Sequence, residues 1–302
     1  MMGASLFFVY TEAAKIPGRP PSTLGEGFMR RIISIAITMM AAATASAADE
    51  AADYRLCTGR DRSTDAIAAC SRLIGNPTVG PAKKAEAHNG RGRHRIASGN
   101  PAGAEEDFRA AIKLNPRYAQ AFINRAFLFY ERKRYQDALT DIDRAIAIDP
   151  TSGKAYANRG NVYYKIGRYK QALGDYETAI ALNSTSARMW RNRGNVYLRL
   201  KRYVDAVADY TRALAIRPKS TRTLVSRAAA FAALRDYQKS LADFDAALSI
   251  EPDHLGAHLG RGLVHERMGR RAAAIKDYQT ALRIDPRNIH AKAELARLKA
   301  NR

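Results

Sequence analysis

Small and apolar residues recur along most of this chain with a period of 34 residues. Within each period they form two runs with i, i+3, i+4, i+7 spacing, which predicts two amphipathic helices. In residues 153–186 the pattern predicts a first helix over 154–166 and a second over 170–182. Gly167, between them, suits the left-handed conformation that ends many helices. Six units follow one another directly, at 85–118, 119–152, 153–186, 187–220, 221–254 and 255–288.

Conserved residue types within the unit indicate how its two helices pack. The eighth position is glycine or alanine, the twenty-fourth is aromatic or isoleucine, and the twenty-seventh is alanine. A glycine such as Gly160 lets the second helix pass close to the first, and Ala172 offers a matching small residue. Neither helix can bury its apolar face alone, so neighbouring units must stack into a solenoid.

The repeated signature resembles that of a known family. It reads Tyr156, Gly160, Tyr163, Ala172, Tyr176 and Ala179 in one unit, and Trp190, Gly194, Tyr197, Ala206, Tyr210 and Ala213 in the next. This pattern resembles the tetratricopeptide repeat, a helix–turn–helix module, over about two thirds of the chain. The resemblance implies an all-α, right-handed superhelical solenoid. Such arrays are interaction platforms with many unrelated partners, so the fold alone does not give the function.

An arginine at the seventh position and an aspartate at the twenty-third occur in all six units. In one interpretation, the arginines form a row of ligand-binding residues along the array. The other pairs each arginine with the aspartate of its own unit, between packed helices. We favour the second, because groups that recur together in every unit reflect packing that every unit shares. The arginines are Arg91, Arg125, Arg159, Arg193, Arg227 and Arg261, and the aspartates are Asp107, Asp141, Asp175, Asp209, Asp243 and Asp277.

The resemblance also implies a binding surface, because in the family the outer face of each first helix lines a concave groove that takes peptides or helices. Here this face holds positions 2, 5, 9 and 12 of the unit. In the middle units it carries Lys154, Asn161, Tyr164, Arg188, Arg191, Asn195 and Arg222, which are our candidate ligand-binding residues. Three of them, Lys154, Arg188 and Arg222, lie one repeat apart, which predicts a basic stripe.

Apolar residues share this face at either end of the stripe. The early units place Ile123, Phe127 and Tyr130 there, and the later ones Val225, Ala229, Ala232 and Leu263. An apolar strip beside a basic one fits a peptide with hydrophobic anchors and acidic residues. The alternative is that the charges are a solvated surface and the apolar residues pack against neighbouring units.

Arg191 and Asn195 resemble half of the carboxylate clamp with which some family members hold a peptide C-terminus. The next two units carry Ser226, Gly256 and Gly260 where the rest of that clamp would need Asn, Lys and Arg. We therefore do not expect a full clamp.

The beginning of the chain lies outside the repeats. Residues 29–47 combine a basic start, a short apolar run and Ala45-Ser46-Ala47, as in a secretory signal peptide cleaved after Ala47. The run is too short to span a bilayer comfortably, and an uncleaved anchor is the alternative. We expect residues 1–28 to be a non-native or disordered leader. Export predicts a periplasmic or secreted protein with no transmembrane segment in the mature chain.

Residues 48–84 form a degenerate helical hairpin that contains both cysteines of the chain, Cys57 and Cys70. Two cysteines in one short segment of an exported protein usually pair, so a disulfide is expected. Two buried free thiols are the alternative. The segment resembles the start of exported repeat proteins of Gram-negative bacteria. At the other end, residues 289–302 are expected to form a capping helix that covers the sixth unit.

The chain carries 50 basic and 29 acidic residues, for a net charge of +21. Residues 1–47 hold four of the basic and two of the acidic residues, which leaves +19 beyond them. This surplus predicts long-range attraction to anionic partners but says nothing about the fold.

No catalytic motif stands out, and no cofactor or metal is expected. The cluster of His254, His258 and His265 is explained by packing, because His258 and His265 stand where other units have aromatic residues. The sequence thus favours a non-enzymatic protein- or peptide-binding scaffold of the cell envelope. The alternative is a binder of an anionic polymer or surface: nucleic acid, lipopolysaccharide or acidic glycan. Nucleic acid is disfavoured by the export signal and by the lack of an aromatic and basic stacking platform. The sequence leaves the oligomeric state open.

Overall fold

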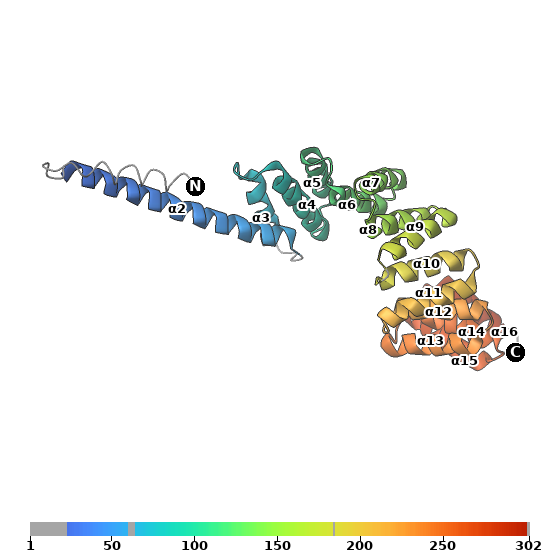
Figure 1. Ribbon diagram of the computed structural model, residues 1–302. Helices are drawn as coiled ribbons and strands as arrows, with labels where there is room; N and C mark the ends of the chain where they lie inside the picture. The colour runs from blue at the N-terminus through green and yellow to red at the C-terminus, as the bar shows by residue number, and fades with distance from the viewer. Residues whose placement is uncertain (1–22, 60–63, 184, 301–302) are drawn as a thin grey trace.

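The computed structural model describes residues 23–59, 64–183 and 185–300, and this part of the chain is helical throughout. Twelve helices form six hairpins that coincide with the predicted units, and Figure 1 shows them stacked in a curved array. The hairpins are α4 (Pro81–Ala97) with α5 (Pro101–Leu114), α6 (Ala119–Glu131) with α7 (Tyr135–Ile148), α8 (Gly153–Lys165) with α9 (Tyr169–Leu182), α10 (Ala187–Arg199) with α11 (Tyr203–Ile216), α12 (Thr221–Ala233) with α13 (Tyr237–Ile250), and α14 (Leu255–Arg267) with α15 (Arg271–Ile284).

Two further helices precede the array and one follows it. α2 (Thr23–Thr58) and α3 (Thr64–Gly75) pack against each other and against α4, and α16 (Ile289–Ala300) packs against α15. α2 crosses the predicted cleavage point without a break, and Figure 1 shows its first part extending away from the array. The predicted leader lies outside the described residues except for 23–28, which form the first turns of α2.

No helix in the described ranges is both long and apolar enough to cross a membrane. α16 buries Leu298 against Tyr278 of α15 and leaves its basic residues outside, as expected of a cap.

Each hairpin turns at the fifteenth residue of its unit, which adopts the left-handed conformation in all six cases. Glycine holds this position in three units, including Gly167 with a φ of +78°. Lys133, Lys201 and Arg235 hold it in the others, with φ values of +59°, +60° and +61°. The N–H of the next residue donates to the carbonyl of the eleventh, as from Arg168 to Tyr163 at 2.8 Å. The closed turn therefore does not require glycine, although a side chain here costs about 1–2 kcal/mol.

An aromatic ring from the second helix fills the space beside the eighth-position glycine. A Cβ built on Gly160 would lie 3.1 Å from the Tyr176 ring, and one on Gly194 would lie 2.7 Å from the Tyr210 ring. The residue opposite Gly160 is thus the Tyr176 ring rather than the predicted Ala172. The glycine lets a whole aromatic side chain become buried, and Tyr176 and Tyr210 are 2% and 0% exposed.

The seventh-position arginine pairs with the twenty-third-position aspartate in every unit, which confirms the packing interpretation. In the fourth unit, Nε and Nη2 of Arg193 each donate to Asp209 at 2.8 Å, in a two-pronged contact. Asp209 is 4% exposed, whereas the Arg193 guanidinium also lies over the Trp190 ring, 5.0 Å from its centre. The equivalent pairs join Arg91 to Asp107, Arg125 to Asp141, Arg159 to Asp175, Arg227 to Asp243 and Arg261 to Asp277.

We predict that Asp209→Ala lowers the free energy of unfolding by about 3 kcal/mol, because it leaves the Arg193 guanidinium between helices without its partner. Arg188→Ala, on the exposed side of α10, should change it by less than about 0.5 kcal/mol. Denaturant unfolding followed by circular dichroism measures both. Equal losses for the two variants would contradict the structural role assigned to the pair.

Candidate functional site

The first helices of the six hairpins share one face, and all three cavities described below open on it. The candidate residues predicted from the sequence lie on this face, together with the sixth position of each unit, which the prediction omitted. We call this face, formed by positions 2, 5, 6, 9 and 12 of α4, α6, α8, α10, α12 and α14, the groove. In units 2 to 5 these positions contain no aspartate or glutamate.

Four predicted residues form a continuous basic stripe on α8, α10 and α12: Lys154, Arg188, Arg191 and Arg222. Partial desolvation and the neighbouring charges of Arg93 and Arg188 lower the pKa of Lys154. Burial, followed by the charges of Arg222 and Arg188, lowers the pKa of the half-buried Arg191. These cations therefore lie close enough to repel one another.

The stripe lacks the carboxylate partners that the seventh-position arginines have. Within the described residues, Arg188 and Arg222 make no side-chain hydrogen bond or ion pair. Arg191 donates only to Asn192 (3.2 Å), and Lys154 only to Gln120 (3.4 Å). An anionic ligand placed here would relieve this repulsion, so the stripe is a candidate site for one.

The two predicted asparagines lie beneath the stripe and receive hydrogen bonds from buried tyrosines. Asn161 accepts from the Tyr176 hydroxyl at 2.6 Å and from Asn192 at 2.9 Å. Asn195 accepts from the Tyr210 hydroxyl at 2.7 Å. These bonds fix the amide orientations, so the groove floor is rigid and polar.

The predicted Tyr164 packs its ring beside Tyr169 of the next helix, with centres 5.7 Å apart, and burial raises its pKa. It therefore contributes to the groove wall and not to the basic stripe.

Asparagines at the sixth position were not anticipated, although their sequence signal is plain. Asn124, Asn158 and Asn192 lie one repeat apart, in units 2, 3 and 4. Asn124 donates to Asn89 at 2.8 Å, and Asn192 to Asn161 at 2.9 Å. These two bonds each link a first helix to the first helix of the preceding unit, a role that depends on how the units stack.

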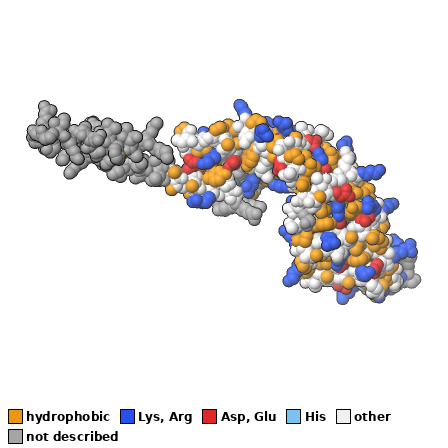
Figure 2. All heavy atoms as spheres, viewed as in Figure 1, with side chains coloured by type: hydrophobic (Ala, Val, Ile, Leu, Met, Phe, Trp, Pro, Cys, Tyr) orange, Lys and Arg blue, Asp and Glu red, His pale blue; other side chains and the backbone are white. Residues whose placement is uncertain are grey.

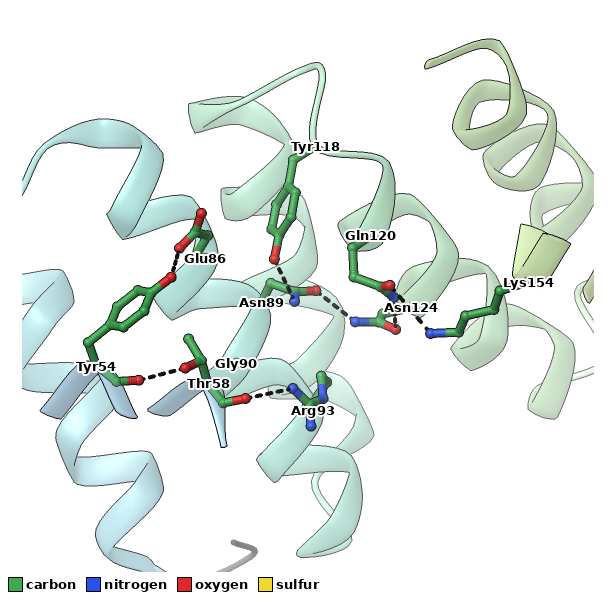
Figure 3. A pocket seen from close by; sticks show the side chains of 10 residues that line it. All are labelled: Tyr54, Thr58, Glu86, Asn89, Gly90, Arg93, Tyr118, Gln120, Asn124 and Lys154. Carbon is green, nitrogen blue, oxygen red and sulfur yellow. Dashed lines mark hydrogen bonds between the residues drawn. The ribbon is translucent and has the colours of Figure 1, made fainter. Parts of the chain in front are cut away.

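The groove ends at the N-terminal side in a polar cavity of about 470 Å³ (Figure 3). Tyr54 of α2 donates a short hydrogen bond to Glu86, and that bond, with burial, raises the pKa of Tyr54 to about 12. Across the cavity, Tyr118, Asn89, Asn124, Gln120 and Lys154 are joined in a chain of hydrogen bonds. The cavity therefore joins residues of the opening helix to those of units 1 to 3.

A disulfide holds α2 in place beside this cavity. Cys57 and Cys70 are paired, with Sγ atoms 2.10 Å apart, and both are fully buried. Gly90 of α4 lies against Cys57, where a Cβ would come within 2.6 Å of the Cys57 carbonyl oxygen. His94 contacts the same oxygen through Nε2 at 2.9 Å. The contribution of α2 to the groove was missed by sequence reasoning, because nothing in the segment itself indicates which helix it meets.

The apolar residues predicted for the groove divide between its surface and the core. Ile123 is 3% exposed and belongs to the core between units 2 and 3, so the packing alternative is right for this residue. Phe127 and Leu263 are 48% and 45% exposed on the groove. The groove thus retains apolar surface on both sides of the basic stripe.

The three clustered histidines make contacts within the protein, and His265 Nε2 lies 4.0 Å from Asp277, which His258 also contacts. His258 contacts Asp277 through Nδ1 (3.1 Å) and the Pro252 carbonyl through Nε2 (2.8 Å). His254 accepts a hydrogen bond from the Ala257 N–H and caps α14. Among the described residues, no group of three or more His, Cys, Asp or Glu side chains could hold a metal ion.

Comparisons with known proteins agree with this architecture. The family model for the tetratricopeptide repeat matches residues 89–153, 158–221 and 226–289. The solved structure of YrrB, described as a TPR protein with an unusual peptide-binding site, is 25% identical with a TM-score of 0.54, covering 63% of this chain and 98% of YrrB.

Two more distant structures share the fold. Pseudomonas aeruginosa PilF is 20% identical with a TM-score of 0.63, over 70% of this chain and 97% of PilF. A tetratricopeptide repeat protein from Parabacteroides merdae is 16% identical with a TM-score of 0.57, over 78% of this chain and 91% of its own. No curated protein matches the chain.

We predict that replacing both cysteines by serine lowers the stability of the opening hairpin by about 3 kcal/mol, since the bond closes a short loop. Because each unit contacts only its neighbours, the loss should stay local. Amide hydrogen exchange should therefore accelerate in residues 50–58 and stay unchanged in α12 to α15. Unchanged exchange in residues 50–58 would show that the disulfide does not hold α2 against the array.

Proposed function

Because the chain belongs to the tetratricopeptide repeat family, we propose that it is a non-enzymatic scaffold that binds an acidic segment of a partner protein in its groove. Proteins built from these repeats serve as interaction platforms, and the structurally similar YrrB is described as having a peptide-binding site. The observation that carries the proposal is the basic stripe of Lys154, Arg188, Arg191 and Arg222, whose charges have no carboxylate partner among the described residues.

The cations of the stripe differ from the other repeated arginines of the chain in their partners. The seventh-position arginines are neutralised by aspartates inside each unit, so they do not add to the field in the groove. Desolvation first, and then the charges of neighbouring arginines, lower the pKa values of Lys154 and Arg191. An extended acidic peptide would place carboxylates among them and form charge-assisted hydrogen bonds.

Basic residues also cover the outer surface, as the scattered blue side chains in Figure 2 show, and the whole chain carries +21. This supports a second candidate function, binding of an anionic polymer or surface: nucleic acid, lipopolysaccharide or an acidic glycan. The two functions differ in where the ligand binds. An acidic peptide would depend on the four cations of the stripe, whereas the binding of a polymer attracted by total charge would not depend on which four cations are removed.

We further propose that the scaffold works in the cell envelope, in the periplasm or outside the cell. Residues 29–47 have the parts of a signal peptide, and a buried disulfide suits an oxidising compartment.

We predict that changing Lys154, Arg188, Arg191 and Arg222 together to alanine weakens binding of an acidic peptide by about tenfold or more, a loss of at least about 1.4 kcal/mol. The probe is a fluorescein-labelled 12-residue peptide of alternating Glu and Ser, followed by fluorescence anisotropy at low and moderate salt.

The matched control changes Lys113, Lys170, Arg212 and Lys276, which are exposed on second helices, and removes the same total charge. This control should weaken peptide binding by less than about twofold, since distant surface charges are screened. Equal weakening by the two variants, with the same salt dependence for a heparin probe, would favour the anionic-polymer function instead.

We also predict that the exported protein begins at or near Ala48, because the sequence Ala45-Ser46-Ala47 precedes that residue. Intact-mass spectrometry of protein from the envelope fraction measures this. A mass that retains residues 29–47 would refute cleavage.

A further inference from the structure

The groove has a cavity at two of the boundaries between units. The two cavities are lined by equivalent positions but differ greatly in volume. In each, positions 9 and 12 of one first helix face positions 6, 9 and 10 of the next, above the residue at position 24. Between units 2 and 3 the cavity measures about 80 Å³. Between units 5 and 6 it measures about 390 Å³.

Side chains of the protein itself fill the smaller space. Phe127 and Tyr130 enter from α6, and Asn158 and Asn161 from α8. Tyr130 also packs against Tyr135 with ring centres 5.9 Å apart, which holds it in place. Little room is left for a ligand side chain.

In the larger space, three of the four equivalent filling residues are small. Ala229 and Ala232 stand in place of Phe127 and Tyr130, and Gly260 in place of Asn158. The missing side chain at Gly260 has a structural reason, because the Phe244 ring lies against it and a Cβ would come within 2.4 Å of that ring. The alanines have no such constraint, since Ala229 is exposed and Ala232 half-buried. Between units 5 and 6, the volume equivalent to that of Phe127 and Tyr130 is therefore open.

The walls of this space are apolar and its rim is basic. Tyr237, Phe244, Leu263 and Val264 line it, and Leu263 is 45% exposed. Arg235 and Arg267 also line it. Neither guanidinium makes a hydrogen bond or ion pair with any residue that the structure describes. An occupant that matches both features is an apolar side chain flanked by carboxylates.

We propose that this space, which we call the anchor pocket, binds one large apolar side chain, preferably aromatic, of the acidic segment held by the basic stripe. The proposal rests on the function proposed above and adds a specificity element to it. Arg222 of the stripe and the alanines of the pocket lie on the same helix, α12, so one bound segment can contact both. The ligand class is therefore a segment in which acidic residues adjoin an aromatic one.

The test uses the full chain and a set of fluorescein-labelled 12-residue peptides of Glu and Ser. The parent peptide has no apolar residue, and each other member carries one Phe at a different position. Burial of that side chain should make at least one member bind about tenfold more tightly than the parent.

The variant Ala229→Phe/Ala232→Tyr places in the anchor pocket the side chains that fill the equivalent space between units 2 and 3. It should lose the gain from Phe, so that the Phe-bearing peptide and the parent peptide bind this variant with the same affinity. Ala208→Phe, on the exposed side of α11, is the matched control and should keep the gain. Thermal melting verifies that both variants fold. Absence of a Phe-dependent gain in the wild type, or its persistence in the filled variant, would overturn the proposal.

Failure of the parent peptide to bind would count against the proposed function alone. A second probe therefore tests the pocket independently of that peptide. Anilinonaphthalene sulfonate is an aromatic anion that suits apolar walls beside two arginines. Its fluorescence should show saturable binding to the wild type and to Ala208→Phe, with a loss of about tenfold or more in affinity for the filled variant. Equal binding to all three proteins would overturn the pocket as an apolar site.

Discussion

The ion pair between the seventh and twenty-third residues of the unit is the interaction on which the remaining structure depends. It crosses from the first helix to the second in all six hairpins and is almost completely buried on the aspartate side, as at Asp107, Asp209 and Asp277. A buried pair of this kind adds little net stability compared with apolar packing, but it is costly to break and demands one geometry. Its repetition therefore sets the same crossing of helices in each unit, and identical units can stack with a regular offset.

This constraint separates the residues of each unit into two groups. Positions that contact the pair, the buried ring or the tight turn have little freedom, whereas the groove positions vary from unit to unit. The variation is ordered: hydrogen-bonded amides and a polar cavity lie at the N-terminal side, unpaired cations in the middle, and an open apolar space at the C-terminal side. The proposed binding function therefore rests on residues that depart from the repeat.

Most of the fold could be predicted from the sequence because it is periodic. The six hairpins, the final helix and the pairing of Arg193 with Asp209 all follow from residues that recur at one spacing. The partner of Gly160 was assigned to Ala172 instead of Tyr176, since the period gives the face of a helix but not which side chain on that face reaches furthest. The seven candidate residues lie on the face of the first helices that the sequence assigned to them, and their role in binding stays a prediction. The stripe of Lys154, Arg188 and Arg222 was predicted from the period, but the effect of Arg93 on Lys154 required the structure, because these two residues lie two units apart. The contribution of Tyr54 could not be anticipated, since it depends on how a helix outside the repeat pattern meets Glu86.

The regular placement of the stripe gives the groove a fixed length scale. Lys154, Arg188 and Arg222 occur once per unit, on first helices that contact one another in succession. Packed helices lie about 8–10 Å apart, and an extended chain advances about 3.3 Å per residue. A straight peptide in the groove therefore meets a new cation about every third residue. Under the proposed function, such a surface would select segments by the interval between their negative charges, so two segments of equal composition and different order would bind with different affinity.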